Sequence, residues 1–326
     1  MTTLVTGATG FLGRNLVDRL APGRDRVRAL VRAGTDGTWL RERGVDVVPG
    51  DLFDEGVLRA AADGCGLVFH LAGVVSHNRR ALAAMRTVNV EGTRRLLASA
   101  ETGARVVHVS SVAAVGPVAS PDLRADEKHE FPAWAARLPY AQMKREAEQV
   151  ALEGVARGMD VVIANPGFLL GPGDVYRVST WPVFAYIAGR LRLTVTGGLS
   201  FVDARDVASG LVELARSGRA GDRTILTAAA GNLSWDAFLT LVAEVSGVKR
   251  RTVRLPAPAV SSLAAAVPWL VEPDEVRAAS HWWFCTPAKA ERELAFVTRP
   301  LAETVADTLA DVPVREATRP APRLRV

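Results

Sequence analysis

The sequence predicts an α/β fold with a doubly wound parallel sheet and a smaller C-terminal α/β unit. Three observations indicate this fold class. In the first half of the 326 residues, short apolar runs alternate with helical patterns, as in parallel sheets joined by crossover helices. A glycine-rich turn follows the first apolar run and opens the first helix. After Pro166 the chain becomes turn-rich and then carries more aromatic residues, which indicates a change of unit.

Apolar periodicity places the individual elements in order. We expect strands at 3–6, 27–31, 45–48, 67–71, 105–110, 161–164 and 224–227, of which 67–71 is almost wholly apolar, as in the middle of a parallel sheet. We expect helices at 11–20, 57–62, 88–100, 140–156 and 206–217, and one that begins after an N-cap at Ser234 and ends near Ser246. The apolar stretch 256–271 predicts a packed helix stopped by Pro268, with an interfacial or oligomer-contact role as the alternative.

Composition excludes several classes of protein. Hydrophobic residues make up 48% and charged residues 23%, which is typical of a folded globular chain. The net charge of +5 is spread along the chain without a basic block, so we expect no nucleic-acid partner. Cys65 and Cys285 lack metal-ligand spacing, and we expect reduced thiols and no metal site. The N-terminus lacks the features of a signal peptide and no apolar stretch is long enough for a membrane span, so we expect a cytoplasmic protein.

The glycine-rich turn has the context that a dinucleotide-binding motif requires. It reads Gly7-Ala8-Thr9-Gly10-Phe11-Leu12-Gly13, between a strand and a helix. Gly7 allows the tight turn, Gly10 lets the backbone approach a pyrophosphate, and Gly13 allows the helix to pack closely on the strand. The free N–H groups of the helix N-terminus would bind the phosphates. The alternative is a tight turn with a structural role only.

The end of the second strand predicts which dinucleotide binds. NAD enzymes usually place an acidic residue there to bind the ribose hydroxyl, whereas this chain has Arg32. A guanidinium pairs well with the 2′-phosphate of NADP, and Arg14 could assist. The sequence therefore favours NADP over NAD, with a solvated surface arginine as the alternative.

A tyrosine and a lysine follow on the helix predicted at 140–156. Tyr140 and Lys144 are four residues apart and share one face of it. A lysine ammonium beside a phenol favours the phenolate, so we expect Lys144 to lower the pKa of Tyr140 toward the range useful for proton transfer. The strand before this helix ends in Ser110-Ser111.

Together these motifs resemble the extended short-chain dehydrogenase/reductase superfamily, which is also called the NAD-dependent epimerase/dehydratase family. The resemblance covers about residues 2–208 and is greatest to its dihydroflavonol reductase-like and carbonyl reductase branch. Besides the motifs above, the matching segments are Gly50-Asp51-Leu52, His70-Leu71-Ala72-Gly73, Asn89-Val-Glu-Gly-Thr93, Pro166-Gly167 and Phe201-Val-Asp-Ala-Arg-Asp-Val207.

The resemblance implies a role for each matching residue. Tyr140 would be the general acid, Lys144 would bind the nicotinamide ribose, and Ser111, chosen over Ser110 by its distance from Gly116, would bind the substrate oxygen. The remaining cofactor contacts would be Asp51 and Leu52 at the adenine, Leu71 and Ala72 at the ribose, and Pro166 and Gly167 at the nicotinamide. Asn89 would organise water or backbone, or simply be a polar residue near a helix end. The resemblance also implies a homodimer through the helices near 88–100 and 140–156.

Departures from the family narrow the expected activity. Phe168 stands where sugar-nucleotide members often have an asparagine, and Val115 where they often have a tyrosine. Val112 and Ala113 replace the acidic pair of the dehydratases, and Met143 replaces a serine that often precedes the family lysine. We therefore expect an NADP-dependent oxidoreductase, a ketoreductase, that transfers hydride between the nicotinamide and a small-molecule apolar or aromatic ketone or aldehyde. The alternatives are a nucleotide-sugar epimerase with bound NAD(P) and a non-catalytic NADP-binding regulatory protein.

The domain organisation follows from these motifs. We expect residues 1–166 to form the NADP-binding Rossmann domain, rejoined by 201–228, residues 167–200 and 229–316 to form the substrate-binding domain, and 317–326 to be a mobile tail. Aromatic residues of the second part predict an apolar or aromatic pocket, although we expect at least half of this set to pack in the core: Trp134, Trp181, Phe184, Trp282, Trp283 and Phe284. His70 and His108, on apolar strands, are expected to be hydrogen-bonded core residues.

Overall fold

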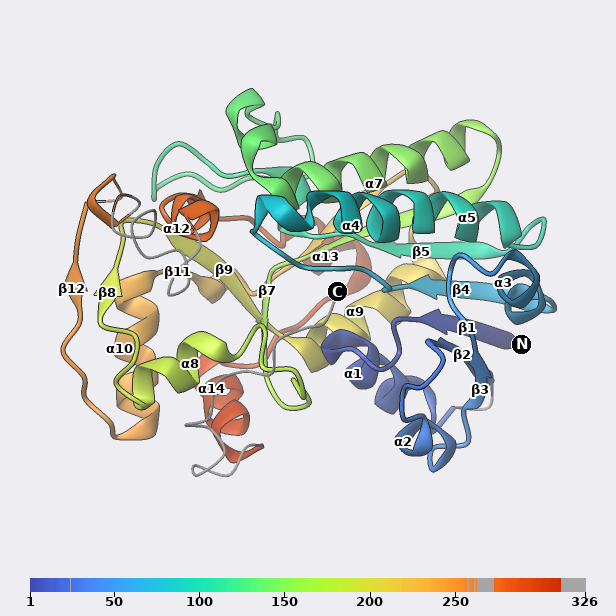
Figure 1. Cartoon of the computed structure of the whole chain (residues 1–326), viewed down its shortest axis with the longest axis horizontal. Helices are drawn as coiled ribbons and strands as arrows, with labels where there is room; N and C mark the ends of the chain where they lie inside the picture. Colours follow the sequence, from blue (N-terminus) through green and yellow to red (C-terminus); the bar gives the residue numbers. More distant parts are fainter. Residues whose placement is uncertain (24, 257, 261, 263–272, 312–326) are drawn as a thin grey trace.

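The computed structural model describes residues 1–23, 25–256, 258–260, 262 and 273–311. Its larger unit is a seven-stranded, wholly parallel sheet with the strand order β10-β6-β5-β4-β1-β2-β3 (Figure 1). The strands are β1 (Thr2–Thr6), β2 (Arg26–Val31), β3 (Asp46–Pro49), β4 (Cys65–His70), β5 (Arg105–Val109), β6 (Asp160–Pro166) and β10 (Arg223–Leu226). The chain winds away from β1 in both directions, which is the Rossmann arrangement, and its crevice lies at the carboxyl ends of β1 and β4.

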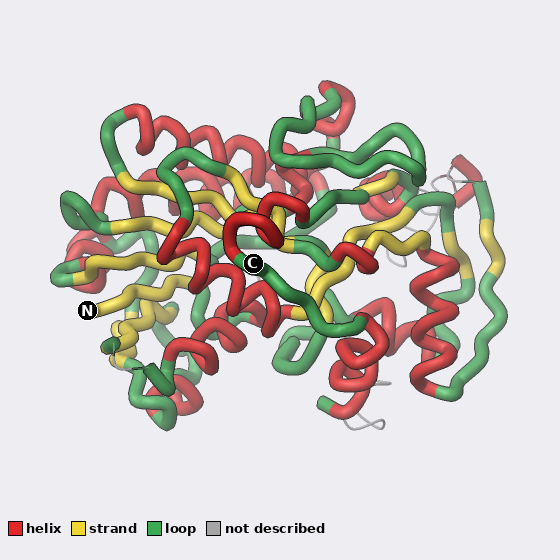
Figure 2. Tube along the Cα trace, turned by 180° about the vertical axis from the view of Figure 1, so that it is seen from behind, coloured by secondary structure: helices red, strands yellow, loops and turns green. Residues whose placement is uncertain are grey.

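Helices cover both faces of this sheet (Figures 1 and 2). On one face, α1 (Phe11–Leu20), α9 (Ala204–Ser217) and α13 (Ala288–Leu294) bury apolar residues against the strands. On the other face, α3 (Glu55–Ala62), α5 (Gly92–Ser99) and α7 (Pro139–Ala156) do the same. The short elements at the edges and loops are α2 (Thr38–Arg41), η1 (Arg79–Ala81), α4 (Leu82–Met85), the π-helical turn η2 (Arg86–Glu91), α6 (Val112–Val115) and η3 (Ala133–Arg137).

The second unit is built around a small mixed sheet. Strand β9 (Gly198–Asp203) pairs in parallel with β7 (Phe168–Leu170) and β13 (Trp282–Trp283), and antiparallel with β11 (Asn232–Ser234). The helices α8 (Trp181–Ile187), α10 (Trp235–Ser246) and α14 (Leu301–Ala310) enclose a core that includes Phe201 stacked on Phe238. The remaining elements are η4 (Ala229–Gly231), α12 (Pro273–Ala279) and the two-stranded pair of β8 (Leu193–Thr194) with β12 (Val253–Arg254).

The predicted strands of the first half and the helices predicted at 11–20, 57–62 and 140–156 lie within about two residues of the observed ones, and α1 has the predicted bounds. The helix predicted at 88–100 differs, because α5 begins only at Gly92 and residues 86–91 form the π-helical turn η2. The N-cap is also confirmed, since the Ser234 side chain accepts a hydrogen bond from the Ala237 amide. The segment 201–228 was predicted to rejoin the large unit. Strand β10 pairs in the large sheet and α9 packs against it, whereas residues 201–203 belong to β9 of the small sheet. The helix predicted at 256–271 and the tail predicted at 317–326 lie outside the described residues, except for 256, 258–260 and 262.

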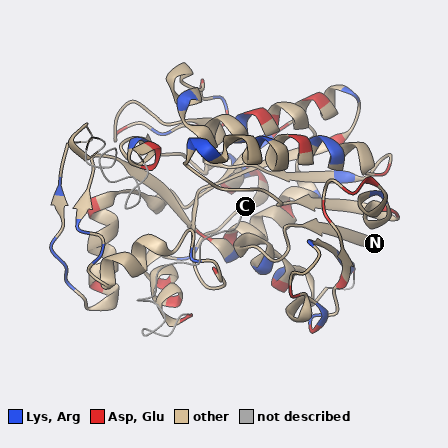
Figure 3. Cartoon of the chain, in the orientation of Figure 1, with Lys and Arg blue, Asp and Glu red and all other residues tan. Residues whose placement is uncertain are grey.

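The surface charges are mixed in sign. Basic and acidic residues both occur along α4, α5 and α7 (Figure 3). Across these helices Arg86 pairs with Glu146 and Arg94 with Glu153. Within the described part of the chain, no helix is both long and apolar enough to span a membrane.

Candidate active site

The glycine turn between β1 and α1 forms a close-packed cradle. Gly7 has φ +73°, and a Cβ there would lie 2.7 Å from the Ala72 amide nitrogen, so the turn passes directly beside the end of β4. A Cβ on Gly13 would lie 2.1 Å from the Gly7 carbonyl oxygen. Helix α1 begins after Gly10 with no side-chain cap, so its first N–H groups remain available. This geometry suits the pyrophosphate of a dinucleotide, which needs bare backbone and a helix N-terminus.

Gly13→Ala is expected to destabilise the protein by about 1–3 kcal/mol, because the new methyl group must displace the turn backbone at Gly7. The measurement is the urea midpoint of unfolding. The matched control is Gly56→Ala in α3, where the nearest atom to a built Cβ is 3.6 Å away. That control should be neutral or stabilising by up to about 1 kcal/mol. Equal midpoints for the two variants would contradict the packing argument.

The predicted cofactor residues line the same edge of the sheet. Leu71 and Ala72 lie beside the turn, and both amides donate to Thr6, to its carbonyl oxygen and its hydroxyl respectively. Arg32 follows β2 and is exposed, and its guanidinium makes no hydrogen bond or ion pair with the described residues, although its carbonyl accepts the Thr35 amide. Asp51 follows β3 and accepts the amides of Phe53 and Asp54.

Three of the other predicted cofactor residues are held by packing. Leu52 is buried against Gly92. Pro166 ends β6, and the Gly167 amide donates to the Leu226 carbonyl. A Cβ on Gly167 would lie 2.4 Å from the Ser200 carbonyl oxygen, so glycine is required where the large unit meets the small sheet.

Ser111, Tyr140 and Lys144 converge at the carboxyl end of β5. Ser111 is the N-cap of α6, and its hydroxyl accepts the Ala113 amide at 3.1 Å while also hydrogen-bonding to Tyr140. Tyr140 lies in the first turn of α7, directly after Pro139, which suits a helix start. Lys144 is buried one turn later, and its ammonium donates to the Val109 carbonyl at 3.0 Å. By contrast, the Ser110 hydroxyl is buried and has no partner among the described residues.

The electrostatics of this group correct one sequence-based expectation. Burial raises the pKa of Tyr140 to about 12, and the hydrogen bond to Ser111 only partly opposes it. Lys144 was expected to lower the pKa of Tyr140, but the structure gives burial the larger effect. Burial also lowers the pKa of Lys144 to about 8, against the attraction of Glu148. At neutral pH the phenol therefore holds its proton and the ammonium is largely charged.

A buried polar network below these residues was not predicted from the sequence. Glu148 lies one turn beyond Lys144 on α7 and is 1% exposed. Its carboxylate accepts the Asn165 side-chain amide at 2.5 Å and lies 2.6 Å from the Arg223 guanidinium. Asn165 also donates to the Ser111 carbonyl at 3.0 Å, so the network reaches the backbone of the serine. The i, i+4, i+8 spacing of Tyr140, Lys144 and Glu148 was a signal for this carboxylate, whereas nothing local indicates Arg223.

Asn89 and the two strand histidines have distinct environments. Asn89, on the π-helical turn, bonds both the amide and the carbonyl of Val74, so it organises backbone near Lys144. His70 bonds Thr6 and Thr93, and burial lowers its pKa to about 3. His108 is buried beside it with neither ring nitrogen bonded among the described residues, so the expectation of a hydrogen-bonded core histidine holds only for His70.

The aromatic residues divide between core and surface. Phe184, Trp283 and Phe284 are buried, Trp282 is half-buried, and Trp134 and Trp181 are about 40% exposed. The ring of Trp134 lies 4.1 Å from that of His281, and the ring of His77 contacts Tyr140 edge-on at 5.9 Å.

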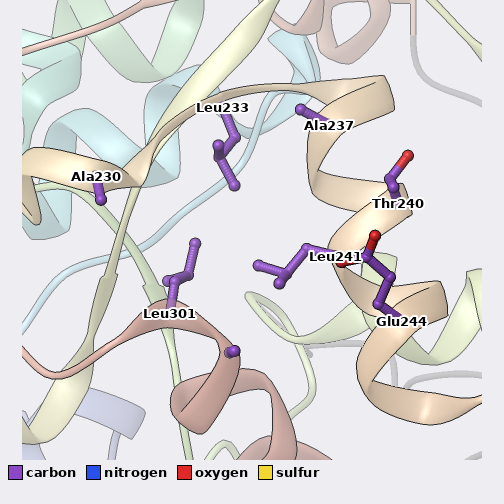
Figure 4. A pocket seen from close by; sticks show the side chains of 8 residues that line it. Ala230, Leu233, Ala237, Thr240, Leu241, Glu244 and Leu301 are labelled. Carbon is purple, nitrogen blue, oxygen red and sulfur yellow. The ribbon is translucent and has the colours of Figure 1, made fainter.

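One cavity lies close to the active-site residues and another lies in the second unit. One of about 340 Å³ adjoins the start of α7 and is lined by Trp134, Arg137, Leu138 and Arg277. Another of about 400 Å³ lies between α10 and the start of α14 and includes none of the predicted site residues (Figure 4).

The sheet order and the glycine turn define a dinucleotide-binding α/β protein, and comparison with known proteins gives the family. Residues 3–227 match the model of the NAD dependent epimerase/dehydratase family. A Synechocystis protein provisionally named dihydroflavonol 4-reductase is 37% identical, over 78% of this chain and 73% of its own length. The 4-hydroxy-2-methyl-3-oxo-4-farnesyl-3,4-dihydroquinoline-1-oxide ketoreductase of Stigmatella aurantiaca is 31% identical, over 81% and 79%. The crystal structure of gox2253 superposes with a TM-score of 0.83 at 30% identity, covering 95% of this chain and 97% of that one.

The chain therefore belongs to the NAD dependent epimerase/dehydratase family, the extended short-chain dehydrogenases/reductases. It is an NAD(P)-dependent oxidoreductase of that family.

Proposed function

We propose that this protein is an NADP-dependent ketoreductase that reduces an apolar or aromatic ketone or aldehyde. The observation that carries the proposal is the convergence of Ser111, Tyr140 and the buried Lys144 ammonium beside the glycine cradle. The names of the relatives from Synechocystis and Stigmatella, a reductase and a ketoreductase, support the same reaction class. We further propose that residues 1–166 with α9 and β10 bind the nucleotide and that the small sheet and its helices bind the substrate.

The proposed chemistry assigns one task to each side chain. A bound nicotinamide would exchange hydride with the substrate carbon. The Ser111 hydroxyl would donate a hydrogen bond to the substrate oxygen and so stabilise the charge that develops there. Tyr140 would give that oxygen its proton, and a phenol whose pKa is about 12 still carries this proton at neutral pH. The Lys144 ammonium would bind the nicotinamide ribose and favour loss of the phenolic proton.

NADP is proposed over NAD because of Arg32. Its side chain is exposed at the end of β2 and has no partner in the described part of the chain. In this fold, the residue at that position contacts the adenosine ribose of the cofactor. The other proposed cofactor contacts are Thr9, Phe11 and Leu12 in the glycine turn, Asp51, Leu52, Leu71 and Ala72 along the sheet edge, and Pro166 and Gly167 at the nicotinamide end.

We expect the purified protein to oxidise NADPH stoichiometrically with apolar ketones or aldehydes, and to use NADH poorly. Arg32→Gln should reduce kcat/KM for NADPH by about tenfold to 150-fold and leave kcat/KM for NADH nearly unchanged, because a charged hydrogen bond to the 2′-phosphate is worth about 1.5–3 kcal/mol. The measurement is initial-rate kinetics with both cofactors against a panel of apolar carbonyl compounds and nucleotide sugars. Turnover without net NADPH consumption would indicate an epimerase instead. Equal use of both cofactors by the wild type would contradict the NADP assignment.

A further inference from the structure

We propose that Trp39 determines cofactor preference by positioning Arg14 at the 2′-phosphate of the nucleotide. This inference rests on the proposed NADP function, and it assigns a role to a residue outside the glycine motif. Two guanidinium groups lie over the Trp39 ring, that of Arg14 at 4.4 Å and that of Arg43 at 4.1 Å from its centroid. Such contacts hold a planar guanidinium in one orientation.

Two further contacts hold Arg43 beside Trp39. Arg43 pairs with Asp18 of α1 at 2.6 Å and donates to the Trp39 carbonyl at 3.3 Å. Trp39 itself packs partly buried against the core beneath α1. The chain of contacts from Asp18 through Arg43 to Trp39 therefore fixes the surface on which Arg14 lies. Asp18 also compensates the charge of Arg43, but not that of Arg14.

Arg14 has the properties of a group placed to meet an anion. It directly follows Gly13, and its side chain reaches α2, which follows the loop that begins at Arg32. Its Nε is buried and unbonded, and it forms no ion pair with a described residue. Asp36 lies in that loop, and its carboxylate accepts the Thr38 amide. The charge of Arg14 contributes to the lowered pKa of Asp36 less than the hydrogen bonds from Thr38 do. Arg14 follows the glycine turn and Arg32 follows β2, so the proposal places a phosphate on the adenosine ribose between these two guanidinium groups.

The test uses nucleotides that lack nicotinamide, so that no turnover is involved. Calorimetry gives the affinity for 2′,5′-ADP and for 5′-ADP, and their ratio isolates the contribution of the 2′-phosphate. We expect Trp39→Leu to lower this ratio about fivefold to tenfold, in keeping with the loss of a partly desolvated cation–π contact. Trp39→Phe should retain most of the preference for 2′,5′-ADP over 5′-ADP, because the phenyl ring can still contact the guanidinium. Trp181→Leu, which removes a more exposed tryptophan from α8, far from the glycine turn in the sequence, should leave the ratio unchanged.

A double variant tests whether Trp39 acts through Arg14. In an Arg14→Gln background, Trp39→Leu should cause little further loss of the ratio, because the group that it positions is already gone. Full additivity, or equal weakening of both nucleotides by Trp39→Leu, would assign Trp39 a merely structural role and overturn the inference. If the wild-type protein itself binds the two nucleotides equally, the NADP assignment fails and Trp39 loses its proposed role with it. Thermal unfolding of each variant confirms that it is folded.

Discussion

Tyr140→Phe is expected to lower kcat for carbonyl reduction by about 10²–10⁴-fold, the usual contribution of a positioned general acid. The substitution removes a single oxygen and keeps the ring that contacts His77. It also removes the hydroxyl that Ser111 bonds, so the oxygen-binding pair loses one of its two donors. NADPH affinity, measured by calorimetry, should change little, because Lys144 keeps its bond to the Val109 carbonyl.

Tyr186→Phe is the matched control. Among the described residues, the Tyr186 hydroxyl is bonded only to the backbone of Arg250 in the second unit, so its loss should affect stability and not kcat. Near wild-type turnover of the Tyr140 variant would exclude Tyr140 as the proton donor. A proportionate loss of kcat and NADPH affinity would instead indicate that the substitution disturbs cofactor binding.

Arg223→Met is expected to destabilise the protein by about 3–5 kcal/mol, the cost of leaving a buried carboxylate without its countercharge. Glu148 is 1% exposed and 2.6 Å from the Arg223 guanidinium, which comes from the outermost strand β10. After the substitution, the uncharged Asn165 amide is the remaining hydrogen-bond partner of that carboxylate among the described residues, and Lys144 attracts it without forming an ion pair. The measurement is the shift of the urea unfolding midpoint at neutral pH.

Adding Glu148→Gln separates charge from packing. The double variant should be more stable than Arg223→Met alone, because the uncompensated charge is removed while Asn165 keeps an acceptor. Strictly additive losses would mean that the two side chains do not interact appreciably. The surface pair Arg59–Glu55, both members 69% exposed, is the control, and its removal should cost at most about 1 kcal/mol.

The nucleotide-binding half of the fold could be predicted because its signals are local. Strand β4 is largely apolar because helices cover both faces of the parallel sheet, and the face of α1 that carries Leu12, Leu16 and Val17 lies against the core. At Gly7 and Gly13 a side chain would clash with backbone atoms, so the glycines themselves indicate the tight turn. The small sheet was mostly not predicted, because β7, β11 and β13 have only two or three residues each and show no periodicity.

The sequence by itself determined the parallel sheet, the glycine cradle and the pairing of Tyr140 with Lys144 on one helical face, since each depends on spacing along a single element. Only the tertiary structure decided their surroundings. Burial raises the pKa of Tyr140, against the expected effect of Lys144, and burial depends on what packs over α7. Arg223 reaches Glu148 across 75 positions of chain, and Arg14 is held by Trp39 of another helix. Such contacts join distant elements, and no local pattern in the sequence encodes them.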